Sequence, residues 1–267
     1  MEIDSSLKQR QGGVTISQSA AGSVVFEARQ SWQAGHHAVA RRQLERALEL
    51  EPQGADRVQA LMGLGLVCRE IGELRTAEEH LLGALAEVAE SPTLAPVMLG
   101  AIHFNLGLLY RHKHDYALSE NHYRQAIEQF ISERMDNLRV QAAQNLAWVL
   151  CLAGRVLDAV DELNAVNDLC SGDLAWHQRL GFAFTVYADG AHVEALELCQ
   201  DITDSIAPAN VRAQALWIAG RASLALGHIT AAVDLAHQAL FHAQGHDHRI
   251  AQDVSRLLID CRGAQGV

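Results

Sequence analysis

The chain has 267 residues, of which 49% are hydrophobic and 20% are charged, so it can bury a core and is not a disordered chain. Its formal net charge is −11, and no basic stripe is visible in the sequence. This argues against a nucleic-acid partner and against an anionic membrane surface. No apolar run approaches the roughly 20 residues that a membrane-spanning helix needs.

The first 22 residues lack the apolar core of a signal peptide, and we expect residues 1–22 to form a polar, flexible tail. None of the five cysteines forms a CxxC pair, and several stand where a helix would bury a small apolar residue. These features favour a reduced, cytoplasmic protein in which cysteines serve packing.

From residue 23 onward the sequence repeats one spacing. A small residue is followed after seven positions by a glycine or its substitute, after five more by an alanine or serine, and after seven more by another small or aliphatic residue. The copies are Ala28, Gly35, Ala40, Ala47; Gly65, Gly72, Ala77, Ala84; Gly107, His114, Ser119, Ala126; Ala147, Gly154, Ala159, Val166; Ala183, Gly190, Ala195, Ile202; and Gly220, Gly227, Ala232, Ala239.

This spacing is typical of paired helices. Two helices approach closely only where side chains are small, and the glycine ends the first helix because it adopts the left-handed conformation without a Cβ clash. Large residues such as Leu44, Leu81, Tyr123 and Leu163 recur at helical period and would fill the space between helices. Abundant Ala and Leu and only four prolines also favour helix throughout.

The pattern resembles the tetratricopeptide repeat family, and the segment NLGLLYRHKHDYALSENHYRQAIEQF carries the resemblance most clearly. His114 departs from the family by replacing the turn glycine. The resemblance implies an all-α fold: a right-handed α-solenoid of six helix pairs and a C-terminal capping helix, thirteen helices in all. The copies begin at residues 28, 65, 107, 147, 183 and 220, further apart than the family period of about 34, so several helices should be about one turn longer than average.

The same resemblance divides the chain into segments. Ser91 and Pro92 indicate the start of one long helix, as an N-cap followed by proline. The last helix has Ile250, Val254, Leu257 and Leu258 on one face. The expected repeats span about 23–54, 55–92, 93–135, 136–172, 173–207 and 208–245, followed by the capping helix 246–262 and a tail 263–267.

In this family, four positions of each first helix line a concave groove. Here those positions hold six aromatic residues and four arginines but no acid, although the chain is acidic overall. Aromatic and arginine side chains dominate binding energies at interfaces, so the groove is the expected site. The positions are Gly22, Val25, Arg29, Trp32; Gln59, Met62, Leu66, Arg69; Ala101, Phe104, Leu108, Arg111; Gln141, Gln144, Trp148, Cys151; His177, Leu180, Phe184, Tyr187; and Gln214, Trp217, Arg221, Leu224.

Two asparagines, Asn105 and Asn145, stand at the same position of consecutive repeats. An amide offers a donor and an acceptor, which matches one peptide unit of an extended chain, and peptide-binding members of the family use asparagines in this way. Alternatively, they bond to neighbouring helices and some aromatics pack between first helices. The residues expected to contact a peptide are Arg69, Phe104, Asn105, Leu108, Arg111, Gln141, Gln144, Asn145, Trp148, Phe184, Tyr187, Trp217 and Arg221.

No catalytic or metal-binding motif stands out. His242, His246 and His248 cluster in one stretch and His112, His114 and Asp115 in another, but neither cluster has HExxH spacing or a cysteine partner. There is no GxxxxGK, GxGxxG or GxSxG segment. We therefore expect no enzyme, no cofactor and no native metal.

The expected function is binding of an extended peptide or a partner helix in the concave groove. One alternative is a peptide-sensing regulator, because the chain also resembles the repeat portion of bacterial signalling-peptide receptors. Those usually carry an N-terminal effector module, for which residues 1–22 are too short. A second alternative is an assembly scaffold that uses the convex face. The sequence names neither the partner nor the oligomeric state.

Overall fold

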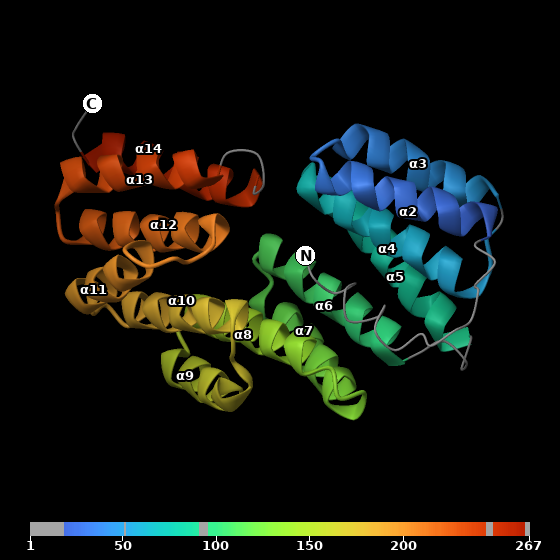
Figure 1. Cartoon of the computed structure of the whole chain (residues 1–267), viewed down its shortest axis with the longest axis horizontal. Coiled ribbons are helices and arrows are strands. Elements are labelled where there is room, and N and C mark those ends of the chain that lie inside the picture. The colour runs from blue at the N-terminus through green and yellow to red at the C-terminus, as the bar shows by residue number, and fades with distance from the viewer. Residues whose placement is uncertain (1–18, 51, 91–95, 244–247, 265–267) are drawn as a thin grey trace. The chain divides into compact units, whose positions relative to one another are not determined.

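The computed structural model describes residues 19–50, 52–90, 96–243 and 248–264 (Figure 1). Within these ranges the chain forms thirteen α-helices, one short 3-10 helix and no strand, which confirms the all-α prediction. The helices are α2 (Ala20–Gln33), α3 (His37–Glu49), α4 (Gly54–Glu70), α5 (Leu74–Glu90), α6 (Pro96–His112), α7 (Tyr116–Ser132), α8 (Asp136–Leu152), α9 (Val156–Asn164), η1 (Asn167–Leu169), α10 (Asp173–Ala188), α11 (His192–Thr203), α12 (Ala209–Ala225), α13 (Ile229–Ala243) and α14 (His248–Ala264).

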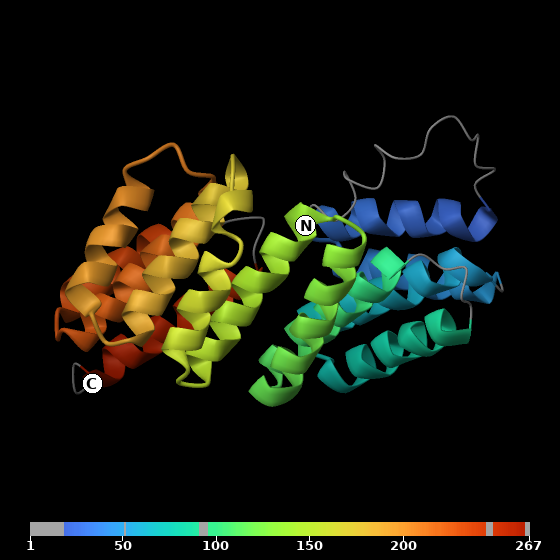
Figure 2. The same ribbon diagram turned by 90° about the horizontal axis from the view of Figure 1, so that it is seen from below.

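The chain divides into two compact units, Met1–Ala142 and Ala143–Val267, which are here called the N-terminal and C-terminal units. In the N-terminal unit α2 packs on α3, α4 on α5 and α6 on α7, and the first helices α2, α4 and α6 also contact one another in sequence (Figures 1 and 2). In the C-terminal unit α10 packs on α11, α12 on α13, and α14 covers α12 and α13. The handedness and the repeat boundaries stay predictions.

Small residues of the first helices lie against large side chains, as the repeat spacing predicts. A Cβ atom on Gly65 would lie 2.6 Å from Leu81 Cγ, and one on Gly107 would lie 2.8 Å from the ring of Tyr123. Both large side chains are fully buried. The glycines therefore set the distance at which α4 meets α5 and α6 meets α7.

The turn after each of these first helices contains one residue in the left-handed region. Gly72 has a φ of +84°, and His114, which occupies the glycine position in its copy, has a φ of +59°. His114 N–H donates to the Arg111 carbonyl at 3.1 Å, as Gly72 N–H does to Arg69 at 3.1 Å. The backbone conformation is thus kept at His114, at a cost in strain because histidine carries a Cβ.

Several helix ends differ from the expectation. Helix α2 begins at Ala20, inside the expected tail, because the Ser19 side chain caps it by accepting from the Gly22 N–H. Helix α14 ends at Ala264 rather than 262. Helix α9 has only 9 residues, because the following segment NAVNDL is rich in Asn and Asp, which favour turns over helix. The predicted start at Ser91 and Pro92 lies outside the described residues.

Other helices are long: α4, α5, α6, α7, α8 and α12 each have 17 residues. In the part of the chain that the structure describes, no helix combines the length and apolar character that crossing a bilayer requires.

Candidate functional site

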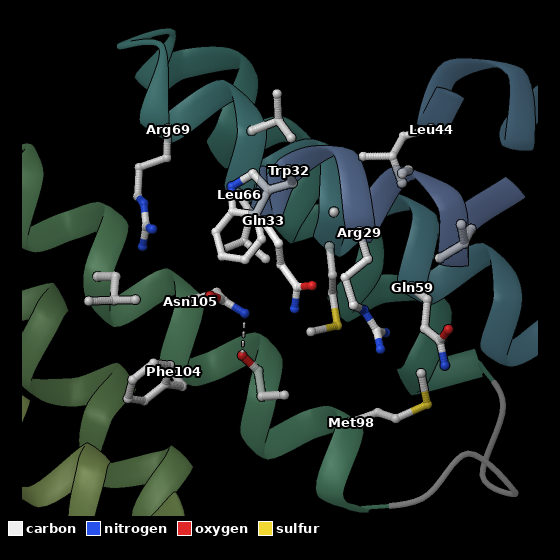
Figure 3. Close-up of a pocket in the computed structure, with 17 residues that line it drawn as sticks. Arg29, Trp32, Gln33, Leu44, Gln59, Leu66, Arg69, Met98, Phe104 and Asn105 are labelled. Atoms are coloured by element: carbon white, nitrogen blue, oxygen red, sulfur yellow. Dashed lines mark hydrogen bonds between the residues drawn. The ribbon is translucent and has the colours of Figure 1, made fainter. Parts of the chain in front are cut away.

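A cavity of about 310 Å³ opens in the N-terminal unit, on the face that the first helices α2, α4 and α6 share (Figure 3). Its lining is mainly apolar, and its volume lies at the lower end of the range for ligand pockets. The residues that line it are Val25, Ala28, Arg29, Trp32 and Gln33 of α2; Leu44 of α3; Gln59, Met62, Gly63, Leu66, Val67 and Arg69 of α4; and Met98, Ala101, Phe104, Asn105 and Leu108 of α6.

Four of the residues expected to contact a peptide line this cavity: Arg69, Phe104, Asn105 and Leu108. Arg111 is buried one turn further along α6 and does not line it. Arg69, Phe104 and Leu108 stand at groove positions, which helical periodicity places on one face of a first helix.

The cavity also includes residues that were not among the expected contacts. Arg29, Trp32, Gln59, Met62 and Leu66 occupy groove positions of the first two repeats, so the family spacing contained the signal for them. Gln33 and Met98 do not occupy groove positions, and nothing in the spacing marks them.

Hydrogen-bond donors are concentrated in the cavity wall. The Trp32 Nε1 and Arg69 Nε atoms are buried, and neither finds an acceptor among the described residues. Arg69 does donate from Nη2 to Glu70 Oε1 at 2.6 Å. Burial lowers the pKa of Arg29, whose guanidinium also lies in the wall. A buried donor without an acceptor is costly, so this wall is suited to an anionic or carbonyl group of a ligand.

Asn105 is held within its own helix. Its side chain is 5% exposed, and its Nδ2 donates to the Ala101 carbonyl at 2.9 Å, the bond drawn in Figure 3. Oδ1 is therefore the Asn105 atom suited to accept a bond from a ligand. Asn145 lies on α8 in the C-terminal unit, whereas Asn105 lies on α6 in the N-terminal unit.

In the C-terminal unit, three of the expected contact residues stack on one another, and a fourth packs at an angle beside them. The rings of Trp148 and Phe184 lie 3.7 Å apart and within 6° of parallel, and Trp217 lies 5.9 Å from Trp148. Tyr187 contacts Phe184 at 6.0 Å. These aromatic residues, on α8, α10 and α12, thus pack between first helices, one of the two interpretations that the sequence allows.

Polar residues of this surface also have partners within the unit. Gln144 donates to Gln178 at 3.2 Å. Arg221 donates to Asp260 of α14 at 2.6 Å and to the Tyr187 hydroxyl at 3.4 Å. Arg221 therefore ties the capping helix to α12, and a ligand carboxylate would have to compete with Asp260 for it.

Within the described ranges, no group of three His, Cys, Asp or Glu side chains is placed to hold a metal ion. His246 of the C-terminal cluster lies outside those ranges. His114 Nδ1 instead lies 3.1 Å from the Tyr116 hydroxyl.

Comparison with known proteins supports the repeat assignment. Residues 27–92 and residues 101–129 each match a model described as tetratricopeptide repeat. No curated protein matches the sequence.

Solved structures share the fold at low identity. The apo form of the quorum sensor NprR from B. thuringiensis is 14% identical, with a TM-score of 0.65 over 96% of this chain and 73% of that chain. NprR in complex with its cognate peptide NprX is 14% identical, with a TM-score of 0.70 over 96% of this chain and 77% of that chain. A Rap protein complexed with competence and sporulation factor is also 14% identical, with a TM-score of 0.70 over 99% of this chain and 80% of that chain. At this identity the likeness shows the fold alone.

Proposed function

Because this chain carries tetratricopeptide repeats, we propose that it binds an extended peptide, with the cavity between α2, α4 and α6 as the main site. The observation that carries the proposal is the composition of the cavity wall: apolar side chains interrupted by buried donors without acceptors. The proposed role is binding, and we propose no catalytic residue. Two structures with this fold, NprR with its cognate peptide NprX and the Rap protein with competence and sporulation factor, hold such partners.

The chemistry of the wall defines the ligand class. Met62, Leu66 and Phe104 would surround one bulky apolar side chain. Arg69, with Arg29 across the cavity, would hold an acidic group beside it, since a guanidinium binds a carboxylate through parallel hydrogen bonds. We therefore expect a peptide with a large apolar residue next to Asp, Glu or a free C-terminus.

Most of the remaining expected contacts form a second surface in this proposal. The groove residues of the C-terminal unit would offer a peptide-binding surface of that unit, separate from the cavity: Gln144, Asn145, Trp148, Phe184, Tyr187, Trp217 and Arg221. Gln141 remains an expected contact of the N-terminal unit. Since the aromatic rings of the C-terminal surface already stack, we assign them a shaping role and expect the half-buried Trp148 and Trp217 to present their exposed edges to a peptide. Arg111 would serve charge attraction rather than direct contact.

The test is an array of hexapeptides of systematic sequence, probed with the full chain. We expect bound peptides to share a bulky apolar residue next to an acidic one. In solution, Leu66→Trp fills the cavity and should abolish binding of the tightest hexapeptide, while Arg69→Met should weaken it by about 10-fold to 100-fold, the range for a lost charged hydrogen bond.

Arg75→Met is the matched control, because Arg75 is an exposed arginine of α5 that does not line the cavity. It should leave the affinity unchanged. Equal losses in Arg69→Met and Arg75→Met would mean that general charge attraction, not the cavity, binds the peptide. No enrichment on the array, with the variants folded, would rule the proposal out.

A second candidate, an assembly scaffold, is favoured by one observation. Leu157 and Val193 occupy the same repeat position on α9 and α11 and are 81% and 60% exposed. Isolated exposed apolar side chains are ordinary, but two at one repeat position suggest a contact stripe. Leu157→Asp with Val193→Asp should lower the assembly mass in light scattering if this surface holds a partner copy, and should leave hexapeptide binding intact.

A further inference from the structure

Two histidines meet between α6 and α7, behind the wall of the cavity. His103 Nδ1 lies 3.0 Å from His122 Nδ1, and the two rings stack at 5.2 Å with 24° between their planes. His103 is only 8% exposed. A hydrogen bond between two Nδ1 atoms requires one ring to donate and the other to accept, so at least one imidazole must be neutral.

In the described part of the chain, no acid forms an ion pair with either imidazole. Tyr110 also stacks on His122 at 5.3 Å, and its hydroxyl donates to Glu78 of α5 at 2.7 Å. Lys113 also donates to Glu78 at 2.6 Å, so this carboxylate is already engaged. Among the described residues, neither imidazole has another hydrogen-bond or ion-pair partner.

Other charged groups lie on α6 and on the elements around it. They are Arg69 of α4, on the cavity side, Arg111 of α6, Asp115 in the turn before α7, and the ion pair of Glu120 and Arg124 on α7. None of them is a cause of the shifts at the two imidazoles. A first proton still leaves one ring able to accept, whereas a second proton removes the acceptor and places two positive charges in contact.

Burial, followed by the facing His122, lowers the pKa of His103 to about 4, and burial also lowers the pKa of His122. An imidazole exposed to water has a pKa of about 6.5. Any state in which α7 separates from α6 therefore binds more protons between about pH 6.5 and pH 4, and packing is weakened as the pH falls through that window.

The pair is connected to the cavity through its sequence neighbours. Phe104 and Asn105, directly after His103 on α6, line the cavity. The Phe104 ring also contacts Tyr123, the neighbour of His122 on α7, edge to face at 5.7 Å. Loss of the α6–α7 packing would thus displace Phe104 from the wall.

We propose that His103 and His122 form an acid-sensitive joint that releases α6 from α7 when it is protonated and thereby lowers the affinity of the cavity. The effect on affinity rests on the proposed peptide binding. The acid-sensitive contact between α6 and α7 does not require a ligand. Acidification would then act as a signal that frees the peptide.

The experiment compares the full-length wild type with the His103→Asn, His122→Asn double variant, which retains a neutral amide pair able to bond through equivalent atoms. Hydrogen exchange of residues 98–108 of α6, corrected for intrinsic rates, is measured near pH 7.5 and near pH 5.5. Exposure of His103, whose pKa rises from about 4 to the value in water, should alone raise the opening of wild-type α6 by about tenfold between these pH values, and exposure of His122 acts in the same direction. The double variant should show no such rise.

His36→Gln is the control, because His36 is exposed and makes no capping bond with its side chain. It should behave as wild type. An equal acid response of α6 in wild type and double variant would overturn the joint, whatever the ligand. Because the comparison is between pH values, lower overall stability of the double variant does not obscure it.

The ligand arm uses the tightest hexapeptide of the array and follows its dissociation constant over the same pH range. Because affinity falls only as the closed state is depopulated, we expect the wild-type constant to match that of the double variant near pH 7.5 and to rise above it where exchange shows α6 to be mostly open. If α6 is mostly open by exchange and the affinity is unchanged, or if α6 stays mostly closed over the whole pH range, the coupling to the cavity is wrong. If the array yields no hexapeptide, the proposed function fails, whereas the exchange result still decides whether the joint exists.

Discussion

At the scale of single residues, the repeat is held by glycines that face large buried side chains. Gly107 lies under the Tyr123 ring and Gly65 under Leu81, with no room for a methyl group at either place. Gly83 of α5 differs, because a Cβ there would meet only Leu61 Cδ1 at 3.8 Å. Replacing glycine by alanine should therefore change the free energy of unfolding in opposite directions at these positions, which a stability measurement can test.

We predict that Gly107→Ala destabilises the protein by about 1–3 kcal/mol, since the added methyl forces the fully buried Tyr123 to shift. Gly83→Ala should stabilise it by about 0.5–1 kcal/mol, because alanine favours helix and meets no obstruction. Urea unfolding followed by circular dichroism gives both values. A loss of stability in both variants would show that the close contact with Tyr123 is not the reason for the loss at Gly107.

The glycines at helix contacts and turns could be predicted from the sequence, because close helix packing and a left-handed backbone each admit very few residue types. Sequence reasoning predicted the left-handed turn at His114 from spacing, but it missed Arg134, which has a φ of +55° without a glycine to mark it. It placed Phe104 and Asn105 on the groove face. It could not foresee that Asn105 bonds to Ala101, or that His103 meets His122, because such contacts depend on rotamers and helix packing.

At the scale of elements, α14 packs against both α12 and α13. Val254, Leu257 and Cys261 are fully buried against α12 and α13, and Asp260 accepts from Arg221 of α12. Gly220 of α12 lies under Leu257, where a Cβ would approach Cδ2 to 2.7 Å. The sequence indicated the apolar face of α14, but the short α9 shows that helix lengths follow local turn preferences that the repeat spacing does not contain.

The contact between Gly220 and Leu257 predicts a non-additive pair of substitutions. Leu257→Ala should cost about 2–5 kcal/mol through the cavity it leaves, and Gly220→Ala about 1–3 kcal/mol through overpacking. The double variant should be more stable than the sum of the two losses implies, since the new methyl group of residue 220 fills part of the space that Leu257 vacates. Strict additivity in urea unfolding would place the two residues in separate packing environments.

At the scale of the whole molecule, the fold consists of elements that contact mainly their neighbours in sequence. In such arrays stability is close to a sum of local terms, so damage in one place should remain local. The division into two compact units, with the cavity entirely in the N-terminal unit and the aromatic stack in the C-terminal one, has the same origin. A single substitution can therefore report how far cooperativity extends along the chain.

Leu163 of α9 is the position best suited to this test, because it is fully buried and contacts α10, where a Cβ on Gly181 would lie 3.1 Å from Leu163 Cδ2. Leu163→Ala should destabilise its surroundings by about 2–5 kcal/mol. Hydrogen exchange followed by mass spectrometry should then show faster exchange in α9 and α10 and unchanged protection in α2 to α5. Equal acceleration in all helices would instead mean that the chain opens as one cooperative body, and that a ligand in the cavity of the N-terminal unit would stabilise the aromatic stack of the C-terminal unit as well.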